Sequence, residues 1–130
     1  MAILSNCPGL KVEVIVGDTP LEEYEGNGDE ESRPNTSFKY VEATTGAAFT
    51  VKYYFDDTFR ASHGVRINTT LDGKVVSGRI HRKAHLVKNE GSTISGARSY
   101  IRGKAYTNGF RFSEILQGKN LISALYPITY

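Results

Sequence analysis

The chain has 130 residues, a formal net charge of +2 and a single cysteine, Cys7. This length suits one domain that folds without a disulfide or a metal ion, and a lone cysteine excludes an internal disulfide. No stretch approaches the ~18 apolar residues of a membrane span, and the first residues lack the features of a secretory signal. We therefore expect an intracellular protein of the cytoplasm or nucleus with no membrane partner.

The charges are divided unequally along the chain. Residues 1–57 hold 11 acidic and 4 basic side chains, whereas residues 58–130 hold 3 acidic and 12 basic ones. Seven of the carboxylates fall between Asp18 and Glu31, with no cation among them. If the two halves stay apart in the fold, such a molecule attracts copies of itself head to tail or steers a charged partner.

The first half predicts strands around an acidic loop. Apolar and polar residues alternate along residues 10–16 and 49–55, which predicts a strand with one buried face in each segment. Residues 18–37 are rich in acidic residues, Gly, Asn and Ser, so they predict a surface loop. Residues 38–43 predict another strand, and Asp56-Asp57 predicts the turn that ends residues 49–55.

The second half predicts a hairpin and several shorter strands. Asp72-Gly73 stands between two alternating segments, residues 65–71 and 74–80, and supplies the positive φ angles of a type I′ turn. Farther on, we predict strands at residues 84–88, 97–101 and 110–112, loops at residues 91–96 and 103–109, and a short helical turn at residues 114–117.

Short strands with turn signals every ~8–12 residues predict an all-β fold. We expect a single antiparallel β-sandwich of the jelly-roll-like or immunoglobulin-like kind, with one short helical turn near the C-terminus. We place this domain at residues 1–120, including the acidic loop at residues 18–37. Residues 121–130 form an apolar C-terminal tail.

Five segments occur in an order and spacing that resemble a fungal family described only as a domain of unknown function. They are PLEEY (20–24), FKYVEA (38–43), GAAF (46–49), DGKVVSG (72–78) and FRFSEI (110–115). The resemblance implies a β-rich intracellular protein from a fungus. It implies no activity and assigns no catalytic residue.

The residue patterns that would indicate catalysis or metal binding are weak. On a strand, His81 and His85 would lie roughly 13 Å apart, and two cations stand between them, so we interpret them as solvent-facing. No serine lies in a Gly-x-Ser-x-Gly elbow, and no phosphate-binding glycine loop is present. We therefore predict a protein that is not an enzyme, with no catalytic residues, no cofactor and no metal site.

The basic half carries a predicted basic patch, which consists of Arg79, Arg82, Lys83, Arg98 and Arg102. Tyr100, Tyr106 and Phe110 interleave with Arg98, Arg102, Lys104 and Arg111 in this half of the chain. Cations beside aromatic rings can bind single-stranded nucleic acid through phosphate pairing and base stacking. The competing interpretation is that the rings fill the core while the cations face solvent.

Two further features favour contact with other proteins. The predicted acidic patch consists of Glu22, Glu23, Glu25, Asp29, Glu30 and Glu31. It is either a solvated loop or a docking strip for a basic surface, and the nearest such surface is the second half of this same protein. The apolar tail contains Leu121, Ile122, Leu125, Tyr126 and Ile128. It is either the last strand of its own sandwich or a strand added to the sheet edge of a neighbour.

The sequence therefore predicts a non-enzymatic protein–protein interaction or self-assembly module, forming a homo-oligomer. One alternative is a nucleic-acid-binding β domain that uses the basic C-terminal half. Another is a lectin-like, carbohydrate-binding sandwich, which rests on analogy between folds alone.

Overall fold

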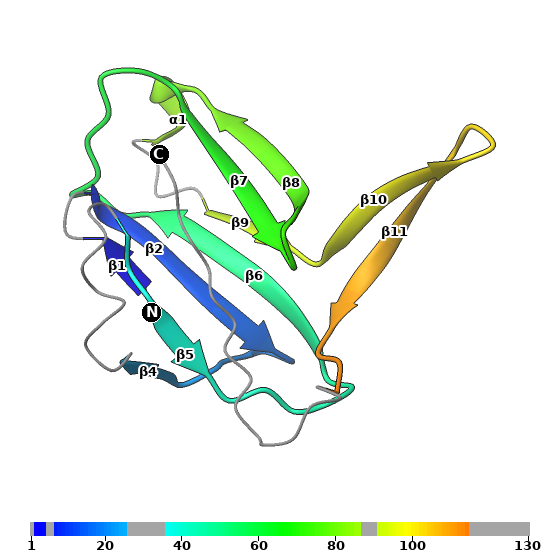
Figure 1. Cartoon of the computed structure of the whole chain (residues 1–130). Coiled ribbons are helices and arrows are strands. Elements are labelled where there is room, and N and C mark those ends of the chain that lie inside the picture. The colour runs from blue at the N-terminus through cyan, green and yellow to red at the C-terminus, as the bar shows by residue number, and fades with distance from the viewer. Residues whose placement is uncertain (1, 5–6, 26–35, 87–90, 115–130) are drawn as a thin grey trace.

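Antiparallel strands make up nearly all of the regular structure (Figure 1). A computed structural model of the chain describes residues 2–4, 7–25, 36–86 and 91–114. The strands are β1 (Ala2–Leu4), β2 (Cys7–Val16), β3 (Thr19–Pro20), β4 (Glu23–Glu25), β5 (Lys39–Val41), β6 (Ala48–Phe55), β7 (Val65–Leu71), β8 (Lys74–His81), β9 (Gly91–Ile94), β10 (Gly96–Ile101) and β11 (Lys104–Arg111). One short helix, α1 (Lys83–Leu86), follows β8.

Strand β6 is the centre of the largest sheet. This seven-stranded sheet has the order β1-β2-β6-β11-β10, with β3 paired to β2 and β9 paired to β6. Strand β2 pairs with β6 from Leu10 opposite Phe55 to Ile15 opposite Thr50. The other edge of β6 is shared by β9 and by the end of β11. Strands β4–β5 and β7–β8 form two separate two-stranded sheets.

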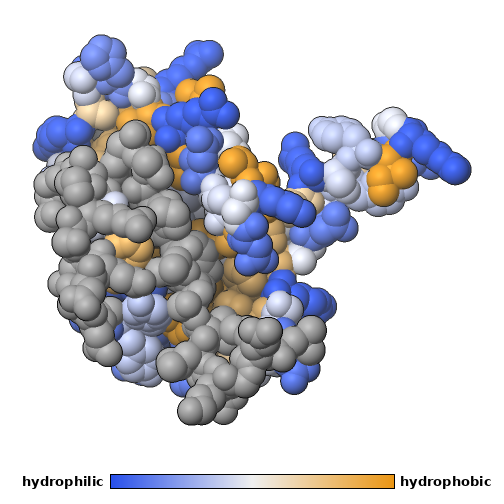
Figure 2. Space-filling view, viewed as in Figure 1, coloured by the Kyte–Doolittle hydropathy of each residue, from blue (hydrophilic) through white to orange (hydrophobic). Residues whose placement is uncertain are grey.

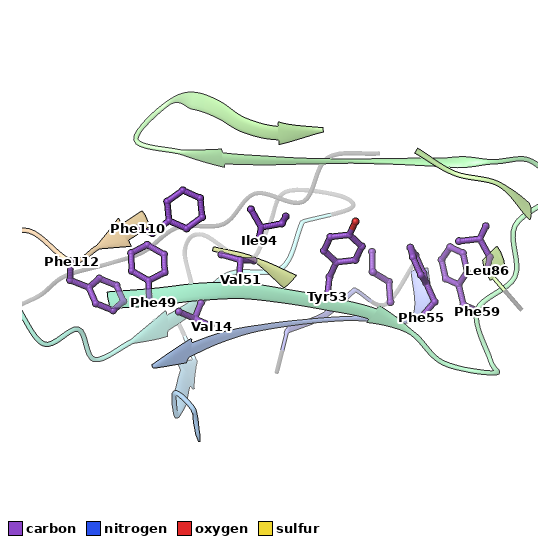
Figure 3. Close-up of a cluster of buried hydrophobic side chains, with 11 residues drawn as sticks. Val14, Phe49, Val51, Tyr53, Phe55, Phe59, Leu86, Ile94, Phe110 and Phe112 are labelled. Carbon is purple, nitrogen blue, oxygen red and sulfur yellow. The ribbon is translucent and has the colours of Figure 1, made fainter. Parts of the chain in front are cut away.

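The core lies on one face of β6. Phe49, Val51, Tyr53 and Phe55 alternate with more exposed residues and are all buried, and Phe55 has no exposed surface. Their side chains point from β6 toward the β7–β8 hairpin (Figure 3). Residues from other segments complete the cluster: Leu10, Val14, Phe59, Leu86, Ile94, Phe110 and Phe112. The strand predicted at residues 49–55, with one buried face, is confirmed.

The hairpin predicted around Asp72-Gly73 is also confirmed. Strands β7 and β8 pair directly across this turn, and the φ angles of Asp72 and Gly73 are 48° and 75°. Val65, Ile67 and Val76 are partly buried against the core, so the hairpin covers one face of β6. An irregularity in register at Thr69/Thr70 leaves Val76 without a partner in the ladder.

A tight turn ends β6, as the two aspartates predict. The Asp56 carboxylate accepts hydrogen bonds from the Thr58 amide, at 2.8 Å, and from the Thr58 hydroxyl, and it lies 3.2 Å from Lys11 Nζ. The Thr58 hydrogen bonds, assisted by Lys11, lower the pKa of Asp56 below its usual value. Gly9 packs against this turn with a φ of 90°, where an added Cβ would lie 2.4 Å from the Phe59 amide nitrogen.

Three local predictions differ from the structure. Residues 84–86, predicted as strand, belong to helix α1, and residues 91–94, predicted as loop, form β9. Helix-forming Ala84 and Leu86 favour a turn of helix at the first site, and pairing with the open edge of β6 makes the second a strand. Residues 104–109 are strand and not loop. The helical turn predicted at residues 114–117 falls almost wholly outside the described residues.

At the level of fold class, the antiparallel all-β prediction is confirmed. The strands form one larger sheet and two small ones, none of them closed, so a single sandwich stays a prediction. Within the predicted acidic loop, the described residues include strands β3 and β4. None of the helices in the described segments is long and apolar enough to cross a membrane.

Candidate functional site

A continuous run of exposed residues, 100–109, lies on the hairpin formed by β10 and β11. Its turn is Arg102-Gly103, with φ angles of 50° and 75°, and Ile101 pairs with Lys104 on either side. These two positive φ angles are those of a type I′ turn, whose twist matches paired strands. Among the described strands the hairpin pairs with the sheet at Phe110 and Arg111, opposite β6, and Ala97 packs against the core at its base. The part nearer the turn projects away from the core (Figure 1).

Large apolar and aromatic side chains are exposed on this hairpin. Tyr100 is 72% exposed, Ile101 58% and Tyr106 47%. In the space-filling view the hairpin stands off the rest of the molecule and carries both hydrophobic and hydrophilic residues (Figure 2). Phe110, at the base, is buried. Core packing therefore explains only one of the three aromatic residues that alternate with cations in this region.

The strand register assigns these side chains to two faces. Tyr100 lies opposite Ala105, and Arg98 lies opposite Thr107 on the same face, because residues two apart share a face. Tyr106 lies opposite Ser99 on the other face, together with Ile101. Each face thus has an exposed aromatic ring, and neither face is purely polar.

The hairpin is strongly basic. Residues 96–111 contain Arg98, Arg102, Lys104 and Arg111 and no carboxylate. All four cations are exposed, and Arg111 Nη1 donates a hydrogen bond of 3.0 Å to the Gly46 carbonyl at the base. We call residues 96–111 the basic hairpin. Its combination of Tyr, Arg and an exposed aliphatic group is typical of protein interfaces.

The predicted basic patch is divided between two parts of the fold. Arg98 and Arg102 lie on the basic hairpin, whereas Arg79 is on β8. Lys83 begins α1, and Arg82 lies between β8 and α1. Arg79 is engaged within the molecule: its guanidinium donates to Ser92 Oγ at 3.2 Å and to the Thr93 carbonyl at 3.4 Å. Arg79 therefore links β8 to β9, and the basic hairpin is the better candidate for external contact.

The described part of the acidic patch surrounds β4. Glu22 and Glu25 are exposed and Glu23 is half-buried. Glu25 forms an ion pair with Lys39 of the neighbouring strand β5. Glu22 accepts a 3.2 Å hydrogen bond from Tyr24, and this bond and the charge of Glu22 raise the pKa of Tyr24.

Strand β4 and the basic hairpin lie at opposite ends of the molecule in Figure 1. The described acidic residues around β4 and the cations of the basic hairpin therefore lie apart in the fold. Asp29, Glu30 and Glu31 lie outside the described residues, as do all five residues of the predicted apolar tail.

A buried polar contact joins the β7–β8 hairpin to the core. Tyr53, which is 1% exposed, shares a hydrogen bond of 2.7 Å between its hydroxyl and Nε2 of His81. Burial raises the pKa of Tyr53 above 10.0, opposed by a hydrogen bond with Ser92 and the charge of Arg79. The phenol therefore stays protonated at neutral pH and acts as a hydrogen-bonding group that holds His81 over the core.

His81 ends β8, whereas His85 lies on α1, so these two histidines do not share one strand as the sequence predicted. The solvent-facing interpretation is confirmed for His85 but wrong for His81, which is half-buried against Tyr53 and Phe55. Within the described segments, no three His, Cys, Asp or Glu side chains gather closely enough to hold a metal ion.

Sequence reasoning missed the projection of the basic hairpin. The signal was Arg102-Gly103, a dipeptide in the same position between strands as Asp72-Gly73. The exposure of Tyr100 and Tyr106 could not be inferred from the alternation of residue types. In β10 and β11, aromatic residues stand between polar ones, as they do in a strand with one buried face.

Comparison with known proteins places the chain in a family by sequence. A model of the family described as Domain of unknown function (DUF7918) matches residues 9–120. No match was found among curated proteins or among solved structures. The expectation of a domain-of-unknown-function family is therefore confirmed: the chain belongs to the DUF7918 family.

Proposed function

We propose that this protein is a non-enzymatic interaction module that associates with itself, the basic hairpin of one copy binding the acidic patch of another. One observation carries this proposal. The basic hairpin projects from the core with Tyr100 and Ile101 largely in solvent, Tyr106 about half-exposed and no carboxylate among its residues.

The energetics of a projecting hairpin support a partner. An isolated two-stranded hairpin is marginally stable in water and gains stability from a third strand or a packed face. Exposed Tyr and Ile side chains lose unfavourable contact with water when a partner covers them. The surrounding cations favour a partner surface that is acidic, because complementary charge speeds encounter and excludes wrong partners.

The acidic patch is a suitable partner surface. Glu22 and Glu25 are exposed at the end of the molecule away from the basic hairpin. Contact between two different surfaces of identical chains is heterologous, so it produces rings or open filaments. The apolar tail, residues 121–130, is proposed as a second contact in such an assembly.

The test is light scattering after size exclusion on the full chain, at low and high salt. We expect oligomers that shrink in high salt, since exposed charge pairs are screened. Lys104→Glu should weaken association, whereas the control Lys74→Glu should leave it unchanged. Both lysines directly follow the glycine of a type I′ turn, one in each hairpin.

A charge swap distinguishes a direct contact from a general charge effect. Glu22→Lys should also weaken association, and mixing it with Lys104→Glu should restore a complex. Oligomer size that does not respond to salt, Lys104→Glu or Glu22→Lys would contradict the proposal, as would a 14.4 kDa monomer under every condition.

Nucleic-acid binding is the second candidate, favoured by the register that places Arg98 and Tyr100 on one face. A phosphate and a stacked base could contact these two side chains together. Titration of labelled single-stranded RNA and DNA would show salt-dependent binding that Arg98→Glu abolishes. Absence of binding at low salt would remove this candidate.

The finer expectations stay predictions. They are a single sandwich, a fungal source, an intracellular location, and the lectin-like alternative, which no feature of the described residues favours. A glycan array without signal would remove the last of these.

A further inference from the structure

The outer edge of β10 has main-chain groups that its partner strand does not use. In a hairpin with a two-residue turn, the residues that flank the turn form a hydrogen-bonded pair, and such pairs alternate with non-hydrogen-bonded ones. Counting from Ile101–Lys104, the pairs Tyr100–Ala105 and Arg98–Thr107 are of the second kind. The N–H and C=O groups of Tyr100 and Arg98 therefore point away from β11.

An independent hydrogen bond supports this count. The alternation predicts that Ser95 and Phe110, one step beyond the Gly96–Gly109 pair at the start of β10, form a hydrogen-bonded pair. The Phe110 amide does donate to the Ser95 carbonyl, at 3.2 Å. Strand β10 ends the order of the seven-stranded sheet, and β11 is its only strand partner within the described part of the chain.

We propose that β10 binds strand β4 of a second copy by strand addition, with main-chain hydrogen bonds formed at Arg98 and Tyr100. This inference rests on the proposed self-association and specifies how the two surfaces meet. The added strand brings β5 with it, so the seven-stranded sheet continues into the β4–β5 sheet of the next molecule.

Charge and edge geometry select β4 as the occupant. Among the described strands, β4 pairs only with β5, so no described strand lies along its other edge. Its side chains are Glu23, Tyr24 and Glu25, and opposite charges across a strand pair stabilise it whereas like charges destabilise it. Pairing of β10 with β10 of another copy would instead bring cations together.

The ion pair between Glu25 of β4 and Lys39 of β5 leaves Glu25 accessible for this contact. Glu25 remains 71% exposed while paired with Lys39, and Tyr24 is 47% exposed. Strand addition obtains its affinity from main-chain hydrogen bonds and its selectivity from such side chains.

Amide hydrogen exchange, measured by NMR on the full chain at low and high concentration, tests the proposal. In the dilute monomer, the Arg98 and Tyr100 amides should exchange faster than those of Ser99 and Ile101, which face β11. When about nine-tenths of the chain is associated, exchange at Arg98 and Tyr100 should slow about tenfold, because only free copies exchange.

Proline substitutions provide a matched comparison, because proline removes one main-chain donor. Arg98→Pro should weaken association more than Arg98→Ala, which removes only the side chain. Thr107→Pro removes the equivalent outward donor from β11 and should have no more effect on association than Thr107→Ala. Exchange at Ser99 and Tyr106 reports whether the hairpin remains paired in each variant.

Three outcomes separate this inference from the proposed function. Protection of the Arg98 and Tyr100 amides on association supports strand addition. Association in which these amides keep exchanging fast overturns strand addition but leaves the docking of side chains intact. A chain that stays monomeric at every concentration overturns both proposals.

Discussion

The two type I′ hairpins of this molecule share a turn but differ in what covers their faces. Asp72-Gly73 and Arg102-Gly103 have nearly the same φ angles. Strands β7 and β8 nevertheless pack on the core, whereas β10 and β11 project from it (Figure 1). The turn thus determines that a hairpin forms, and the pattern of side chains determines whether one of its faces packs on the core. Val75 and Ile80 of β8 stay exposed even in the hairpin that does pack.

The side-chain patterns explain this difference. Val65 and Ile67 are two apart, so they lie on one face of β7, and that face packs against the core. On β10, Tyr100 and Ile101 are adjacent and point to opposite faces. The core can cover only one of those faces, so at least one of these two side chains stays exposed.

The largest effect should come from removing the part of the core that β7–β8 covers. Phe55 has no exposed surface and its ring lies 4.6 Å from that of Phe59 and 5.3 Å from that of His81. We expect Phe55→Ala to lower the free energy of unfolding by about 3–5 kcal/mol. Tyr100→Ala, on the uncovered hairpin, should change it by less than about 0.5 kcal/mol. Urea denaturation of the monomer measures both, and equal effects would contradict the comparison.

Alanine at the second turn position sharpens the comparison. Gly73 and Gly103 both have a φ of 75°, and a Cβ added at either would meet no atom within 4 Å. Alanine therefore adds about 1–2 kcal/mol of backbone strain, and no clash, at each. In Gly73→Ala this strain should lower global stability. In Gly103→Ala it should instead speed amide exchange within residues 96–111, because that hairpin can open locally. Equal losses of global stability would show that the two hairpins unfold together with the core.

The smallest effect concerns the hydrogen bond that holds β8. Tyr53→Phe should cost about 1 kcal/mol at neutral pH, whereas Tyr106→Phe, a change on the uncovered hairpin, should cost little. Because burial raises the pKa of Tyr53 above 10.0, its contribution is complete below pH 10 and is lost as pH rises through the folded-state pKa. Unfolding free energy measured between neutral pH and pH 11 should therefore fall less steeply for Tyr53→Phe than for the unmodified chain.

Local signals explain which parts of the fold could be predicted. Alternation along β6 and the Asp72-Gly73 turn are contained within a few neighbouring residues, and both were predicted correctly. Strand β9 has only four residues, Gly-Ser-Thr-Ile, and becomes a strand because β6 offers it an edge. That edge depends on contacts between distant segments, which no local pattern of residues contains.

The sequence predicted some of the residues of the candidate site but not how they are arranged. The sequence identified Arg98 and Arg102 as part of a basic surface. It grouped them with Arg79, whose guanidinium binds β9 of the same chain. It also offered no reason to separate buried Phe110 from exposed Tyr100. The first distinction depends on the contact between β8 and β9. The second depends on where β11 leaves β6, after the pairs formed by Phe110 and Arg111.

The pairing of β2 with β6 has a consequence for how fast the chain folds. Ile15 and Thr50 meet at one end of this ladder and Leu10 and Phe55 at the other, so a long intervening stretch of chain must close before the core contacts between β2 and β6 form. Both type I′ hairpins require only neighbouring residues. Because closure of distant segments is slow compared with hairpin formation, we expect the hairpins to form early and the β2–β6 ladder to limit the folding rate.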